Sequence, residues 1–168
     1  MSKMGIFYGS SGGNTQNVAK SIAKKLGVND NDMYDVGKAG ASDLIPYDVL
    51  LLGSSTWGLG DLQDDWESFI QTVASVDLSG KKTALFGCGD SSSYPDTFCS
   101  AIGTIYKAIK DRVTVMGFTD TDGYTFDDSE ALIDGRFVGL VIDEDNESNL
   151  TEERINRWIE KLKEDLGQ

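Results

Sequence analysis

Residues 8–15 read Tyr8-Gly9-Ser10-Ser11-Gly12-Gly13-Asn14-Thr15, and they directly follow the apolar run Met4–Phe7. From Thr15 to Leu26 the apolar residues recur at helical spacing. A strand, a Gly/Ser/Thr-rich turn and a helix N-terminus in this order form a site for an anion such as phosphate, because free N–H groups and the helix dipole favour negative charge there. The loop holds no Lys or Arg, so neutral donors would bind that anion. A glycine-rich turn without a ligand is the alternative interpretation.

Apolar runs and helical patterns alternate along the rest of the chain. The run Val49–Leu52 is apolar at consecutive positions, which is typical of a strand covered on both faces. The alternation predicts an α/β fold, a doubly wound three-layer sandwich with a parallel sheet and helices on both faces. The expected strands are Met4–Tyr8, Met33–Val36, Val49–Gly53, Thr83–Cys88, Thr114–Phe118 and Phe137–Ile142. The expected helices are Thr15–Leu26, Asp64–Val73, Phe98–Arg112 and Thr151–Leu166.

The charge balance restricts the partners. The 168 residues, a length that fits one domain, include 28 acids and 15 bases, for a net charge of −13. This charge argues against nucleic acid or an anionic membrane as a partner and favours basic proteins reached by electrostatic steering. Because no apolar segment is long enough to span a bilayer and no signal-peptide core is present, we expect a cytoplasmic protein.

Histidine is absent, and the two cysteines lie eleven positions apart. The absence of histidine excludes hydrolytic triads that use this residue and ordinary zinc sites. Cys88 and Cys99 form no Cys-x-x-Cys pattern, so we interpret them as reduced core residues and expect no metal site.

Two more unusual loops follow expected strands. Residues 54–61 read Ser54-Ser55-Thr56-Trp57-Gly58-Leu59-Gly60-Asp61, and residues 89–96 read Gly89-Asp90-Ser91-Ser92-Ser93-Tyr94-Pro95-Asp96. In a parallel sheet these loops lie beyond the carboxyl ends of the strands, where ligands bind. Trp57 and Tyr94 would be exposed there unless a flat ligand covers them or they fold back onto the core. A phosphate-bearing molecule with a planar ring system would satisfy all three loops.

The chain resembles the long-chain flavodoxins over essentially its whole length. The motifs that carry the resemblance are residues 9–15, Thr56-Trp57-Gly58, Gly87-Cys88-Gly89-Asp90 with Tyr94, Gly135-Arg136-Phe137-Val138-Gly139-Leu140 and Asp143-Glu144-Asp145-Asn146. The resemblance implies a single flavodoxin-like domain over residues 1–168 with a five-stranded parallel sheet of order 2-1-3-4-5. It also implies that the insertion Thr119–Gly135 splits the fifth strand.

Flavodoxins hold FMN without a covalent link and carry single electrons between larger redox proteins, without transforming a substrate. By this resemblance, Ser10–Thr15 would surround the FMN phosphate and Thr56 would reach toward it. Trp57 and Tyr94 would sandwich the isoalloxazine ring, and Gly89–Asp90 would meet its pyrimidine edge. The full set of expected cofactor-binding residues is Ser10, Ser11, Gly12, Gly13, Asn14, Thr15, Ser55, Thr56, Trp57, Gly58, Leu59, Gly60, Gly87, Cys88, Gly89, Asp90, Tyr94, Asp96, Phe98, Cys99 and Asp145.

The resemblance further implies a low-potential carrier that works through a stabilised neutral semiquinone. Aromatic ring faces, the phosphate and nearby acids such as Asp61 and Asp90 all oppose a second negative charge on the flavin. In the family, the peptide that corresponds to Gly58–Leu59 flips so that its carbonyl accepts a hydrogen bond from the reduced flavin. Glycine tolerates the positive φ that such a flip can require, so Gly58 predicts a more stable semiquinone. A turn glycine chosen only for conformation is the alternative.

The expected partners are redox proteins such as a ferredoxin/flavodoxin–NADP reductase or an oxo-acid oxidoreductase. They would dock on the acidic rim Asp61–Glu67, with the insertion Thr119–Gly135 as a second candidate surface, and the carrier itself is expected to be a monomer. The alternative function is an FMN-dependent NAD(P)H quinone or flavin reductase of the same fold. The sequence shows no evident nicotinamide site and no bases in the three loops, which disfavours this alternative. A P-loop nucleotidase is excluded because no Gly-Lys-Ser/Thr follows the glycines.

Overall fold

A computed structural model describes residues 3–167. The strands are β1 (Met4–Gly9), β2 (Met33–Asp35), β3 (Val49–Trp57), β4 (Asp61–Leu62), β5 (Lys82–Cys88), β6 (Thr114–Met116), β7 (Leu132–Ile133), β8 (Arg136–Phe137) and β9 (Gly139–Ile142). The α-helices are α1 (Asn14–Leu26), α2 (Ala41–Leu44), α3 (Asp64–Ser75), α4 (Ser100–Ile109), α5 (Glu144–Glu147) and α6 (Thr151–Asp165). Short 3-10 turns span Asp30–Asp32 and Ser148–Leu150.

The central sheet is parallel, in the order β2-β1-β3-β5-β6. The strand at the β6 edge is made of two pieces. β6 pairs with Lys82–Ala84 of β5, and β9 pairs with the next stretch of β5, Leu85–Cys88. The predicted α/β fold and the strand order 2-1-3-4-5 are therefore confirmed.

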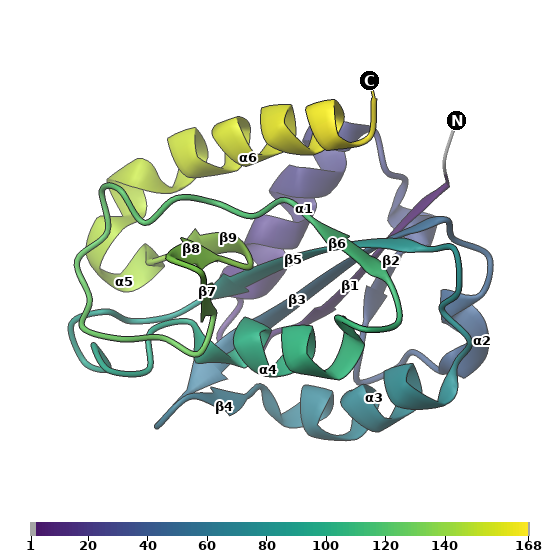
Figure 1. The fold of residues 1–168 in the computed structure, drawn as a ribbon, viewed down its shortest axis with the longest axis horizontal. Coiled ribbons are helices and arrows are strands. Elements are labelled where there is room, and N and C mark those ends of the chain that lie inside the picture. The colour runs from purple at the N-terminus through teal and green to yellow at the C-terminus, as the bar shows by residue number, and fades with distance from the viewer. Residues whose placement is uncertain (1–2, 168) are drawn as a thin grey trace.

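Helices cover both faces of the sheet (Figure 1). Along β3 the side chains of Leu50 and Leu52 enter one hydrophobic cluster, with residues from α2, α3 and α4. Val49 and Leu51 enter the opposite cluster, with residues from α1 and α6. The unbroken apolar run in β3 is thus explained, because each of its two faces is buried against a different helical layer.

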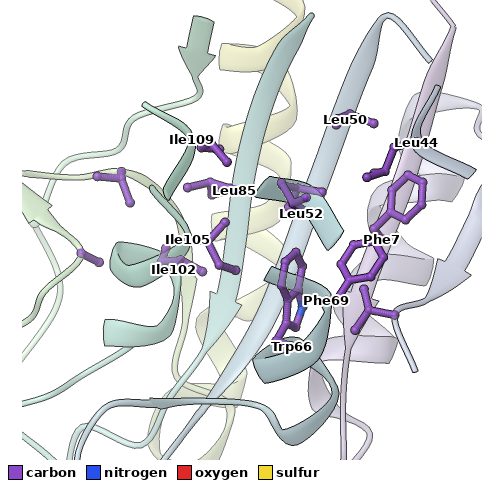
Figure 2. Packing of buried hydrophobic residues seen from close by; sticks show 14 of the residues in the cluster. Phe7, Leu44, Leu50, Leu52, Trp66, Phe69, Leu85, Ile102, Ile105 and Ile109 are labelled. Carbon is purple, nitrogen blue, oxygen red and sulfur yellow. The ribbon is translucent and has the colours of Figure 1, made fainter. Parts of the chain in front are cut away.

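The α3/α4 face is packed with large side chains (Figure 2). Trp66 of α3 is fully buried, and its indole N–H donates to the Gly53 carbonyl of β3 at 2.7 Å. Phe69 lies 5.2 Å from the Trp66 ring, edge to face. This bond and the aromatic packing fix α3 against the middle of β3, next to residues 54–57, which were expected in a loop but continue the strand.

Several expected elements differ in extent. β3 runs on to Trp57 rather than ending at Gly53, and α4 ends at Ile109 rather than at Arg112. The strand expected over Phe137–Ile142 is divided, because Phe137 pairs with Leu132 in the β7–β8 hairpin and β9 begins at Gly139. The helix expected from Phe98 begins at Ser100, because Cys99 adopts a left-handed φ of +52°. The strand expected to reach Phe118 ends at Met116, since Gly117 has a φ of +79°.

Within residues 3–167, none of the helices has both the length and the apolar character needed to cross a membrane.

Candidate functional site

Three loops meet at the carboxyl ends of β1, β3 and β5, around a cavity of about 450 Å³. Many of the residues expected to bind a cofactor border this cavity. Its lining is Ser10, Gly12, Asn14, Thr15, Ser55, Thr56, Trp57, Gly58, Cys88, Gly89, Asp90, Tyr94 and Asp145. Residues of all three loops therefore surround one space, and Asp145 of α5 joins them.

The first loop ends at the N-terminus of α1, whose first turn carries no acidic side chain. Gly13 has a φ of +94°, and its N–H donates to Ser10 Oγ at 3.1 Å, which tightens the turn. Thr15 is fully buried, but its hydroxyl has no hydrogen-bond partner within the described residues. Because buried polar groups are nearly always satisfied, this free hydroxyl on the cavity wall fits an anionic ligand.

Ser55, on β3, also lines the cavity and has a buried hydroxyl without a partner in the described chain. The neighbouring Thr56 is different. Its Oγ1 accepts a hydrogen bond from the Ala101 N–H of α4 at 3.1 Å. The Thr56 hydroxyl is therefore oriented by α4, and it keeps one proton to donate.

Two aromatic side chains flank the cavity. Trp57 is 46% exposed and Tyr94 is 41% exposed, whereas Trp66 and Trp158 are buried. Leaving two large rings half exposed beside a concave site is unfavourable in water, and a flat apolar ligand between them would remove this exposed area. Gly58 lines the same wall in a left-handed conformation with a φ of +48°.

A polar network holds the third loop. The buried Asp143 carboxylate, at the N-terminus of α5, accepts hydrogen bonds from Ser91 Oγ and from Asn146 Nδ2. Asn146 Nδ2 also donates to Asp90 Oδ1 at 2.9 Å, and the same oxygen accepts from the N–H groups of Ser92 and Ser93. The α5 turn thus positions the loop that carries Tyr94.

The same contacts shift two carboxyl groups in opposite directions. The hydrogen bond from Asn146 lowers the pKa of Asp90 below its usual range. Burial, together with the nearby charges of Asp90, Asp143 and Glu144, raises the pKa of Asp145. Ionisation is therefore favoured at Asp90 and disfavoured at Asp145.

Two supporting residues were not predicted as site residues. Gln63 is buried at the N-cap of α3, where its Oε1 accepts from the Asp65 N–H and its Nε2 donates to Ser11 Oγ at 3.1 Å. The sequence gives no signal for this bridge, because glutamine is not a preferred N-cap residue. Asn146 lies in a quoted motif, but only the folded α5 turn brings it to Asp90.

Eight of the expected cofactor-binding residues do not line the cavity. Phe98 is buried against Phe126 and Phe137, and Cys99 is buried beneath Gly89. Leu59 is 84% exposed and points away from the core. The eight are Ser11, Gly13, Leu59, Gly60, Gly87, Asp96, Phe98 and Cys99.

Both cysteines are free and buried, as expected from their spacing. Burial raises the pKa of the Cys88 thiol to about 12, so this side chain stays a neutral part of the cavity wall. In the part of the chain that the structure describes, no group of three or more His, Cys, Asp or Glu side chains is placed to hold a metal ion.

The chain is similar to known proteins in sequence and in structure. The sequence profile of the family described as Flavodoxin matches residues 6–158. The chain is 46% identical to flavodoxin 1 of Escherichia coli K12 over 168 residues, which covers 99% of this chain and 96% of the relative. It is 43% identical to a flavodoxin of Nostoc sp. over 166 residues, 98% of each chain.

Solved structures show the same fold. Fusobacterium nucleatum flavodoxin bound to flavin mononucleotide superposes with a TM-score of 0.91 at 29% identity, covering 98% of this chain and 99% of that one. Flavodoxin 1 of Bacillus cereus superposes with a TM-score of 0.69, also at 29% identity, covering 96% and 97% of the two chains. Together with the match over most of the sequence, these likenesses show that the chain belongs to the flavodoxin family, among its long-chain members.

Proposed function

We propose that this flavodoxin binds FMN in the cavity between its three loops and carries single electrons at low potential between larger redox proteins. One observation carries the assignment of this cavity. Two buried hydroxyls without partners, Thr15 and Ser55, and two half-exposed rings, Trp57 and Tyr94, line the same space. A phosphate joined to a flat ring system fits both halves of this arrangement.

In this proposal, the N–H groups at the start of α1 and the hydroxyls of Thr15 and Ser55 donate to the phosphate. Trp57 and Tyr94 cover the two faces of the ring and exclude water from it. Bound FMN supplies the redox chemistry, and the residues around it set how easily it accepts charge.

The charges around the cavity favour a low potential. Among the described residues, no lysine or arginine lines the cavity, whereas two aspartates, Asp90 and Asp145, line it. A second negative charge at this site would meet these carboxylates with no nearby cation to offset them. Each 1.4 kcal/mol of such repulsion lowers a one-electron potential by about 59 mV.

The proposed docking surface is the acidic rim next to the cavity. Asp61, Asp64, Asp65 and Glu67 are exposed, and the highly exposed Leu59 lies just before them in the chain. Charges of this kind steer a basic partner and orient it. A ferredoxin/flavodoxin–NADP reductase or an oxo-acid oxidoreductase with a basic face would fit this rim. The two free thiols fit a reducing compartment such as the cytoplasm.

The phosphate part of the proposal is tested with Thr15→Val. The change removes a hydroxyl that has no partner in the protein, so the apoprotein should be as stable as the parent or more stable. Hydrogen bonds to charged groups contribute about 1.5–3 kcal/mol, so FMN affinity should fall roughly 10- to 100-fold. The measurement is a titration of apoprotein with FMN, followed by quenching of flavin fluorescence.

Two controls make the result specific. Riboflavin has the ring but no phosphate, so its affinity should be unchanged by Thr15→Val. Thr83 of β5 is also fully buried with an unpartnered hydroxyl, but it does not line the cavity, so Thr83→Val should leave FMN binding unchanged. Equal losses for FMN and riboflavin would contradict the placement of the phosphate.

A further inference from the structure

A second cavity, of about 560 Å³, lies between α6 and the segment that follows β6, and it shares no lining residue with the first. Figure 1 shows that segment running beside α6 before the chain turns back to β7. The buried side chains of Leu140 and Trp158 contribute to its wall. Its volume is within the range of small-molecule sites in proteins, about 300–1,000 Å³.

The lining of this cavity is unusual for so acidic a chain. The sequence contains four arginines, and three of them, Arg136, Arg154 and Arg157, line it together with Lys161. Arginine is the side chain best suited to bind a carboxylate or a similar planar anion, because its N–H groups match both oxygens.

Two of these guanidinium groups lie over aromatic rings that also line the cavity. Arg154 lies 3.8 Å from the ring centroid of Tyr124, and Arg136 lies 5.0 Å from that of Phe118. Stacking on a ring holds a guanidinium plane in place and leaves its edges free for hydrogen bonds. The cations are therefore partly preorganised, from α6 on one side and from β8 on the other.

The hydrogen bonds of these arginines are incomplete within the described chain. Arg154 Nη2 donates to the Gly123 carbonyl at 2.9 Å and to Glu147 Oε1 at 3.1 Å, but its buried Nη1 has no partner. Arg136 forms no ion pair with any described residue, and it is exposed. An anionic ligand in this cavity would accept hydrogen bonds from both groups, the buried Nη1 of Arg154 and the unpaired guanidinium of Arg136.

Acidic side chains limit how much negative charge this cavity can accept. Asp120, Asp122 and Glu153 also line it, and Glu153 pairs with Arg157 at 2.7 Å on the exposed face of α6. A polyanion such as a nucleoside triphosphate would be repelled by these carboxylates and by the net charge of −13. A single negative charge could be placed beside Arg136 and Arg154, with an apolar body against the aromatic wall.

We propose that this cavity is a binding site for a small amphipathic monoanion, a flat apolar molecule that carries one carboxylate. The apolar body packs against Phe118, Tyr124 and Trp158, and the carboxylate accepts hydrogen bonds from Arg136 and Arg154. The site is independent of the FMN cavity, so its occupation does not require release of FMN.

The test uses 1-naphthoate as the probe and its neutral analogue 1-naphthamide, added to FMN-loaded protein. Binding is followed by heteronuclear NMR, in which the indole N–H of Trp158 is a reporter because it lies at the cavity and donates to the Gly117 carbonyl. We expect naphthoate to shift residues 118–124 and α6 saturably, while the flavin absorbance stays unchanged. Naphthamide should bind the parent protein about tenfold more weakly than naphthoate.

Arg136→Gln should weaken naphthoate about tenfold and leave naphthamide unchanged. Arg136 is exposed on a short strand, so the variant should keep the fold, which the unchanged flavin spectrum checks. Lys20→Gln, at an exposed position on α1 with no ion pair in the described chain, is the charge-matched control and should not change the affinity. Equal affinity of the parent protein for naphthoate and naphthamide would overturn the proposal. So would NMR shifts confined to Trp57 and Tyr94, or the absence of saturable binding at probe concentrations on the order of 10 mM.

Discussion

At the scale of single residues, a substitution of Gly58 can test the effect of its backbone conformation without a steric clash with neighbouring side chains. Its φ is +48°, and a Cβ at this position would have only Asp61 Oδ2 near it, at 3.8 Å. A larger side chain therefore fits, so the main effect of a substitution would be on the backbone conformations available to the Gly58–Leu59 peptide.

We expect Gly58→Asn to keep FMN bound but to make the one-electron-reduced state less stable. Restricting the peptide costs roughly 1 kcal/mol, which lowers the first one-electron potential and raises the second by on the order of 40 mV each, so the gap between them should narrow by on the order of 80 mV. A spectroelectrochemical titration of parent and variant measures that gap. An unchanged gap would mean that the glycine serves only the shape of the turn.

Asp145 provides a pH-dependent test of the anionic rim. Its pKa is raised in the folded protein, so its ionised form is disfavoured there relative to the unfolded chain. Asp145→Asn should therefore raise the free energy of unfolding of the apoprotein at pH 7, by less than about 1 kcal/mol for so exposed a group. As the pH falls through this raised pKa the carboxyl of the folded parent becomes protonated, so the advantage should shrink, and it should vanish below the unfolded-state pKa of about 3.9.

Urea unfolding of both apoproteins between pH 7 and pH 3.5 measures this difference. Glu160→Gln, on the exposed face of α6, is the control for the loss of one negative charge from the whole molecule. A stabilisation by Asp145→Asn that did not depend on pH would contradict an electrostatic cause.

The side chains that the sequence could predict are those whose type is unusual for their place. Trp57 and Tyr94 stand out as aromatics in loops, and the structure leaves both half exposed at the cavity. Gln63 and Asn146 could not be predicted, because an amide in a loop has many possible partners. Their bonds to Ser11 and Asp90 arise only when chain segments about 50 residues apart come together.

At the scale of elements, the contact between α4 and the insertion depends on one glycine. A Cβ at Gly103 would lie 2.2 Å from the Glu130 carbonyl oxygen, and the Glu130 N–H donates to Ser100 Oγ of the same helix. Gly103→Ala would favour an isolated helix by about 1 kcal/mol, but overpacking against a backbone costs about 1–3 kcal/mol.

We therefore expect Gly103→Ala to lower the stability of the protein, in spite of its better helix propensity. Thr104→Ala is the matched control, since Thr104 is exposed on the next position of α4 and should gain a few tenths of a kcal/mol. The unfolding temperatures of both variants and of the parent protein show whether overpacking or helix propensity dominates at Gly103. Increased stability of Gly103→Ala would show that the insertion moves away from α4 at little cost.

The long elements were predictable, and the short ones were not. α1, α3, β1, β3 and β5 each carry a strong apolar pattern and form within a few residues of the expected bounds. The β7–β8 hairpin had a usable signal, because Asp134-Gly135 both adopt positive φ and Asp-Gly favours such a two-residue turn. The four-residue helices α2 and α5 are too short to show any periodicity.

At the scale of the whole molecule, the net charge of −13 opposes the folded state through self-repulsion. Raising the salt from 0.1 M to 1 M shortens the Debye length from about 10 Å to about 3 Å. We expect sodium chloride to raise the unfolding temperature of the apoprotein by several degrees over this range, and potassium chloride to act alike. A fall in the unfolding temperature would mean that attractive ion pairs outweigh the repulsion.

The architecture was the most predictable level. Strands that are apolar on consecutive residues, such as β3, require cover on both faces, and this requirement already implies a three-layer fold. The strand order came from the resemblance, and the pairing of β6 and β9 with successive parts of β5 agrees with that order. The sequence pattern could not predict the second cavity, because α6 and the segment after β6 come together only in the folded chain.

The most direct test of the electron-carrier account is an anaerobic reductive titration of the FMN-loaded protein, followed by its absorbance. We predict two separate one-electron steps, with a blue intermediate absorbance that rises and then decays as reduction proceeds. Direct bleaching of the yellow protein in a single two-electron step, together with oxidation of a nicotinamide without any partner protein, would contradict the account and favour a flavin reductase.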